Sequence, residues 1–155
     1  MKTIKKWGII AFGVLLIPIV FMMINTYVNP DVEGGVSEII ERPEVLQEDW
    51  YGRSGLIFFT GFEKQEKIFC QGHAIKQGLR TEVRRESCVP ADHIYTGEGT
   101  YGVTSFNGQT LLRGFTAADR TVTVPGEDVF EKTEGKVKSW YAFVNRSEEV
   151  VPIIE

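Results

Sequence analysis

Cysteine and histidine, the side chains that most often bind metals or activate nucleophiles, are scarce in this sequence. Two of each occur among 155 residues, and there is no internal repeat. Gly52-Arg53-Ser54-Gly55 lacks the spacing of a nucleophile elbow. Gly97-Glu98-Gly99 lacks the spacing of a phosphate-binding loop. The sequence therefore predicts no catalytic residue, no resident metal and no cofactor.

Charge is absent from one long stretch near the N-terminus. The 21 residues from Gly8 to Val28 contain no charged side chain. As a helix they would extend about 31 Å, close to the hydrocarbon thickness of a bilayer. A cleaved signal peptide is the alternative, but its apolar core is shorter and a small-x-small site follows it. No such site follows here, so we expect a retained transmembrane anchor.

Basic residues are also missing between this stretch and the rest of the chain. Lys2, Lys5 and Lys6 precede the apolar run, and the next cation is Arg42. The positive-inside rule then predicts a cytoplasmic N-terminus and an exported C-terminal domain. We expect a single-pass protein of the inner (cell) membrane, with its C-terminal domain in the periplasm.

The residues after the apolar run differ from the whole chain in charge. Without the three early lysines, 14 cations remain against 21 acids, which gives a net charge near −7. Such a balance disfavours nucleic acid and an anionic lipid surface as partners. We expect three regions: the cytoplasmic start and anchor over 1–28, a linker over 29–36 and a β domain over 37–155. Proline and paired glycine, which interrupt regular structure, indicate the linker.

Short runs rich in β-formers dominate the predicted domain. The strongest local signal is Asn107-Gly108, which suits the two positive-φ positions of a type I′ hairpin turn. A two-residue loop would pair Phe106 with Gln109, Thr104 with Leu111 and Val103 with Leu112. Residues 136–144 are apolar on both faces, which predicts a central strand.

Other segments give weaker signals. Further strands are predicted at 55–62, 66–71 and 121–124, and an edge strand at 150–154, where Pro152 lacks a ladder donor. Residues 37–47 could hold a short helix with Ser37 as N-cap, and residues 74–85 fit either a helix or a strand. Strands at this spacing predict a mainly β fold, a small antiparallel sandwich or barrel.

The two cysteines admit two interpretations. In an exported domain Cys70 and Cys88 most simply form one disulfide, which closes a 17-residue loop. Together with His73 and His93 they could instead supply four zinc ligands, or a Cys–His nucleophile pair. An oxidising compartment favours the disulfide.

Three arginines, Arg80, Arg84 and Arg85, fall within the cysteine loop and form a candidate site for a carboxylate-bearing partner. We therefore expect an envelope accessory or protective protein that binds another protein on the periplasmic side. Subunits of a secretion or transfer apparatus and immunity-type proteins share this build. The alternative is an envelope enzyme that depends on zinc or on a thiol and uses the Cys70/His73/Cys88/His93 set.

Overall fold

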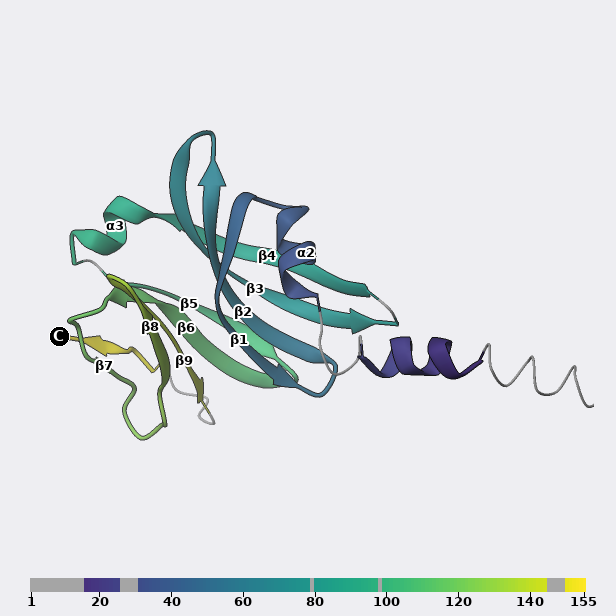
Figure 1. The fold of residues 1–155 in the computed structure, drawn as a ribbon. Helices are drawn as coiled ribbons and strands as arrows, with labels where there is room; N and C mark the ends of the chain where they lie inside the picture. Colours follow the sequence, from purple (N-terminus) through teal and green to yellow (C-terminus); the bar gives the residue numbers. More distant parts are fainter. Residues whose placement is uncertain (1–15, 26–30, 79, 98, 145–149) are drawn as a thin grey trace, which may run out of the picture.

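Two antiparallel sheets lie face to face in the computed structural model, which describes residues 16–25, 31–78, 80–97, 99–144 and 150–155 (Figure 1). The first sheet is a meander of β1 (Glu41–Tyr51), β2 (Ser54–Glu63), β3 (Glu66–Gln77) and β4 (Arg80–Pro90). The second has the order β5-β6-β9-β8, with β5 (Thr100–Phe106), β6 (Gln109–Ala117), β8 (Phe130–Glu134) and β9 (Val137–Val144). The predicted mainly β, antiparallel fold is confirmed.

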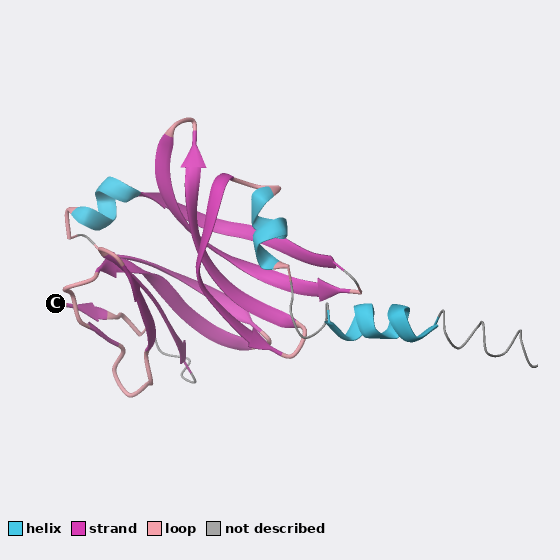
Figure 2. Cartoon of the chain, in the orientation of Figure 1, coloured by secondary structure: helices cyan, strands magenta, loops and turns pink. Residues whose placement is uncertain are grey.

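In the described part of residues 31–155, two short helices and two short strands accompany the sheets, and Figure 2 draws the helices in cyan and the strands in magenta. Helix α2 (Val32–Ser37) packs against β1 and β4, and helix α3 (Ala91–Tyr95) connects β4 to β5. Strands β7 (Val122–Thr123) and β10 (Ile153–Ile154) pair with each other. The predicted strand at the C-terminus therefore exists, although it is only two residues long.

The main core lies between the two sheets. Phe58 of β2 packs edge-on against Phe115 of β6, with ring centroids 5.5 Å apart, and stacks near Tyr141 of β9. These three rings come from three different strands and are buried. Aromatic side chains bury the largest apolar areas per residue, so this cluster holds the sheets together.

Each sheet is also covered on part of its outer face. Val32 and Val36 of α2 pack with Ile57 and Phe59 of β2 in a second cluster. On the other side, Trp140 belongs to a third cluster with residues around β7 and β10. Strands β2 and β9 are therefore buried on both faces, which confirms the central strand predicted at 136–144.

The predicted hairpin at Asn107-Gly108 is confirmed in detail. The φ angles of these two residues are +50° and +80°, as a type I′ turn requires. Phe106 pairs with Gln109, and the other two predicted pairs also occur. Of the ambiguous residues 74–85, residues 74–77 form the end of β3 and residues 80–85 the start of β4.

The predictions for residues 29–47 are wrong where the structure describes them. The helix begins at Val32, after Asp31 as N-cap, so the predicted linker is helical from 32 onwards and residues 29–30 lie outside the described residues. Ser37 is the last helical residue rather than an N-cap, and β1 begins at Glu41. The paired glycine serves packing: a Cβ on Gly35 would lie 2.6 Å from the Val83 side chain, so glycine lets α2 approach β4 closely.

The N-terminal apolar segment is described only in part. Residues 16–25 are helical and exposed, and residues 8–15 and 26–28 of the predicted anchor lie outside the described residues. Within the described part of the chain, no helix has both the length and the apolar character needed to cross a bilayer.

Candidate functional site

The two cysteines are joined by a disulfide. Cys70 of β3 and Cys88 of β4 are direct cross-strand partners, and their sulfur atoms are bonded. Both lie in the cluster beneath α2, so the bond ties the edge strand β4 to its neighbour. The predicted pairing is confirmed.

The four residues of the alternative Cys/His set are not brought together. Cys70 faces α2, whereas His73, three positions along the same strand, packs against Phe106 between the sheets. His93 belongs to the short helix α3. Among the residues that the structure describes, no group of three His, Cys, Asp or Glu side chains could hold a metal ion.

The three predicted arginines do not form one cluster. Residues four apart in a strand share a face and neighbours face opposite ways, so Arg80 and Arg84 lie on one face of β4 and Arg85 on the other. Arg84 pairs with Glu82 at 2.7 Å, and Arg85 pairs with Glu63 at 3.1 Å. Two of the three charges therefore already have an acidic neighbour within the domain.

A buried charge that the sequence analysis missed lies between the sheets. Arg113 of β6 is 2 % exposed, forms an ion pair with Glu86 of β4 and donates a hydrogen bond of 3.2 Å to the carbonyl of Gly72. Glu86 is the extra residue of a bulge in β4, and its carboxylate points inward. The predicted register could have revealed Arg113, because it places Leu111, Arg113 and Phe115 on one face.

His73 shares the same carboxylate. Its Nδ1 contacts Glu86, and its ring stacks on Phe106 with centroids 5.0 Å apart. Burial, and to a lesser degree the charge of Arg113, lower the pKa of His73 to about 4. Burial also lowers the pKa of Arg113 to about 10, so the guanidinium stays protonated and balances Glu86 at neutral pH.

Two buried acceptor atoms of this cluster have no hydrogen-bond partner among the described residues. They are Oε1 of Gln71 and Nε2 of His73. Nε2 is an acceptor because the proton of the neutral ring is on Nδ1, which donates to Glu86. The Nε2 atom of Gln71 lies 3.4 Å from the point where a Cβ on Gly102 of β5 would sit. The cluster therefore extends beneath β5.

The edge strands of the two four-stranded sheets, β1, β4, β5 and β8, differ in how well they are protected against pairing with another chain. Edges are usually blunted by charge, proline or bulges. Strand β1 has two register shifts and Pro43, β4 has a bulge and five charged residues, and β8 has three charged residues in five. Strand β5 has none of these features, and in the described chain it pairs only with β6.

Strand β5 also presents apolar side chains. Tyr101 and Val103 are 46 % and 63 % exposed, and they point to the outer face of the second sheet. Val103 lies beside Leu112, which belongs to the cluster under β7 and β10. An uncharged, regular edge next to exposed apolar side chains can accept a further strand.

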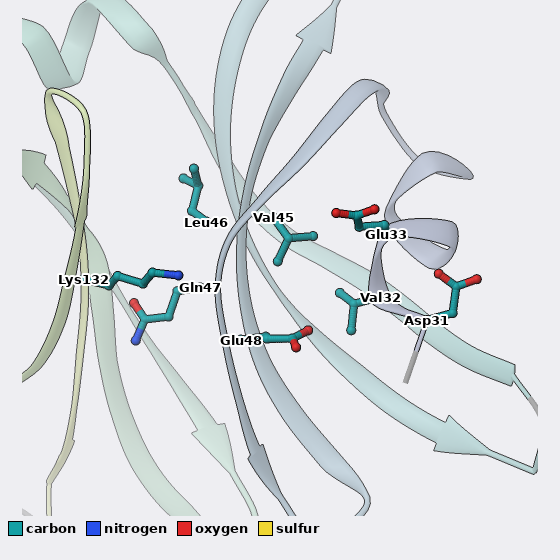
Figure 3. Close-up of a pocket in the computed structure, with 8 residues that line it drawn as sticks. All are labelled: Asp31, Val32, Glu33, Val45, Leu46, Gln47, Glu48 and Lys132. Atoms are coloured by element: carbon teal, nitrogen blue, oxygen red, sulfur yellow. The ribbon is translucent and has the colours of Figure 1, made fainter. Parts of the chain in front are cut away.

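A groove of about 430 Å³ near β1 is less suited to binding than the edge of β5 (Figure 3). Figure 3 shows its side chains on two sides of β1, with Gln47 and Lys132 on one side and Glu33 and Asp31 on the other. Asp31 already caps α2, and Gln47 donates to Asp49 and accepts from Ser139. Its polar groups therefore do not converge on one point.

No family model, curated protein or solved structure matches this chain.

Proposed function

We propose that this protein is a membrane-anchored binding protein, whose β-sandwich takes up an extended segment of a partner protein along β5. The observation that carries the proposal is the state of this edge: among the edge strands of the two four-stranded sheets, as far as the structure describes them, only β5 lacks charge, proline and register shifts. Main-chain hydrogen bonds would supply affinity in such a complex, and side-chain contacts would supply specificity.

The dimensions of β5 define the partner segment. Seven residues at about 3.3 Å each give an edge of about 23 Å, enough to pair with a strand of similar length. Side chains of the added strand would alternate between the two faces. On the outer face they would lie beside Tyr101 and Val103, so we expect apolar residues at every second position of the partner segment.

The N-terminal segment supports a membrane anchor in the proposal. Its described residues, 16–25, are helical, and Ile17 and Phe21 are 70 % and 72 % exposed. Side chains of this kind gain free energy when they leave water, and the helix projects away from the sandwich (Figure 1). With Lys2, Lys5 and Lys6 on the near side, residues 8–28 would hold the domain on the periplasmic side of the inner membrane.

The disulfide fits the same location, because disulfides persist in oxidising compartments. Within the envelope, an accessory subunit of a secretion or transfer apparatus and an immunity-type protein both act by holding another protein. The proposal covers both, because each requires only an anchored domain with an exposed binding edge.

Site-specific photocrosslinking tests the binding edge. A photoreactive residue at Val103 should capture one partner in intact cells, and the same residue at Thr133 on β8 should not. The control position is exposed and lies on the opposite edge of the same sheet.

A charge variant gives a second arm. Val103→Lys places a cation on β5 and should abolish capture by a probe at Tyr101, whereas Thr133→Lys should leave it unchanged. Equal capture from both edges, or full capture by Val103→Lys, would show that β5 is not the binding edge.

A further inference from the structure

The charges of the sandwich are distributed unequally between its two ends. The turns β1–β2, β3–β4 and β5–β6 lie at one end, since Tyr51, beside the first turn, stacks edge-on against Phe106, beside the third. The residues around these turns include three cations, Arg53, Lys76 and Arg80. One acid, Glu82, lies opposite Ile75 and pairs with Arg84. At the opposite end, the β2–β3 turn carries Glu63 and Glu66 together with Lys64 and Lys67, so its charges cancel.

The three cations lie beside the N-terminal helix. A cleft of about 300 Å³ is lined by Met23 and Ile24 of that helix together with Arg53, Lys76 and Gly78 of the sandwich. In Figure 1 the β1–β2 and β3–β4 turns point toward residues 16–25. Arg80 follows Gly78 closely and is exposed, as is Arg53.

Aromatic side chains accompany the cations at this end. Lys76 lies with its Nζ 4.6 Å from the centre of the Trp50 ring, and Tyr51 is 37 % exposed. Tryptophan and tyrosine are enriched at membrane interfaces, because one part of each ring system is apolar and the other is polar.

We propose that this end of the sandwich binds anionic phospholipid headgroups through Arg53, Lys76 and Arg80, an inference that rests on the membrane anchor proposed above. The strands would then stand away from the bilayer, with the basic turns at the surface. Strand β5 would project from the membrane, which leaves its free edge open to a partner.

The net charge near −7 does not oppose this contact. Screening at physiological ionic strength reduces electrostatic interactions beyond about 8 Å. Strand β3 has 12 residues and therefore extends about 40 Å, so the acids Glu63 and Glu66 at the turn after β2 lie several screening lengths from the basic end. The local charge at the turns, rather than the sum over the domain, decides the interaction with the bilayer.

The test uses the full chain in vesicles of phosphatidylcholine, with or without phosphatidylglycerol. The disulfide leaves no free thiol, so Gln109→Cys at the β5–β6 turn provides one labelling site for a fluorophore. Energy transfer to an acceptor at the lipid surface should increase when phosphatidylglycerol is present. High salt should reverse the increase, because the attraction is electrostatic.

Charge-neutral variants identify the residues responsible. Arg53→Gln and Arg80→Gln should each reduce the ratio of surface-bound to free orientation about fivefold, the effect of one cation at an anionic surface. Lys64→Gln, at the exposed β2–β3 turn of the opposite end, should leave the energy transfer unchanged. All three side chains are exposed, so these variants should fold as the parent does.

Flotation of the same vesicles separates this inference from the anchor. If the chain floats with both vesicles but energy transfer does not depend on phosphatidylglycerol, the headgroup contact is refuted and the anchor stands. An equal effect of Lys64→Gln and Arg53→Gln also refutes it. If the chain floats with neither vesicle, the anchor itself is refuted and the headgroup contact with it.

Discussion

The disulfide between Cys70 and Cys88 should contribute about 3 kcal/mol to the free energy of unfolding. It closes a loop of 17 intervening residues, and a loop of about this length gives about 3 kcal/mol in the chain-entropy description. Reduction should therefore lower the urea midpoint by about 2 M, if the slope is about 1.5 kcal/mol per molar urea. The full chain in mild detergent is the sample, and the near-ultraviolet signal of buried Trp140 reports unfolding.

Two comparisons separate the cross-link from side-chain packing. Reduced parent protein loses only the bond, whereas Cys70→Ala/Cys88→Ala also loses the sulfur atoms, which pack beneath α2. We expect the double variant to be less stable than the reduced parent, because its substitutions leave a small cavity. Amide exchange should accelerate first in β4, since this edge strand pairs only with β3.

Thiol titration completes the experiment. The native chain should show no free thiol before reduction and two afterwards. Two free thiols with one equivalent of bound zinc in the native protein would refute the disulfide and revive the Cys/His enzyme alternative. An unchanged midpoint after complete reduction would refute the stability argument alone.

Two further predictions concern the interior. The pKa of His73 falls from 6.5 to about 4 on folding, so between these pH values the unfolded chain binds more protons, and the free energy of unfolding should fall by at most about 3 kcal/mol as the pH drops from 6.5 to 4. His73→Gln can still donate a hydrogen bond to Glu86 and should flatten this part of a pH series of urea midpoints. An unchanged slope in the variant would contradict the assignment to His73. Gly114→Ala should lower the free energy of unfolding, measured in urea, by about 1–3 kcal/mol, because the new Cβ would lie 1.8 Å from the carbonyl oxygen of Thr100. Gly102→Ala should lower it less, because the nearest atom to its new Cβ lies at 3.4 Å.

Local chemistry explains the parts of the fold that the sequence predicted well. Asn107-Gly108 specifies a turn type, and the turn type fixes the register of the two strands, so three residue pairs followed from two residues. The disulfide was equally constrained, because the two cysteines of this chain can form only one intramolecular pair. In both cases the determining residues are few and adjacent, or unique in the chain.

Long-range packing explains the parts that the sequence predicted poorly. The sequence predicts a linker rather than a helix at residues 32–36, because Gly34 and Gly35 disfavour a helix. The segment at 32–37 is helical because Val32 and Val36 bury their side chains on the first sheet, and Gly35 permits close contact with Val83. The residues of this helix do not indicate where β4 lies in the fold, so the helix could not be predicted from its own sequence.

The buried Arg113 shows how the two kinds of information combine. Its inward orientation follows from the hairpin register, and its partner Glu86 lies on the same face of β4 as Arg84, next to the bulge. Without the bulge, the alternation of a regular strand would place Glu86 and Ser87 on opposite faces. The extra residue turns both toward the interior, where Ser87 accepts a hydrogen bond from Gln71 and Glu86 neutralises Arg113. A buried guanidinium without this carboxylate would be costly, so Glu86 is the residue that makes the charged interior beside β5 possible.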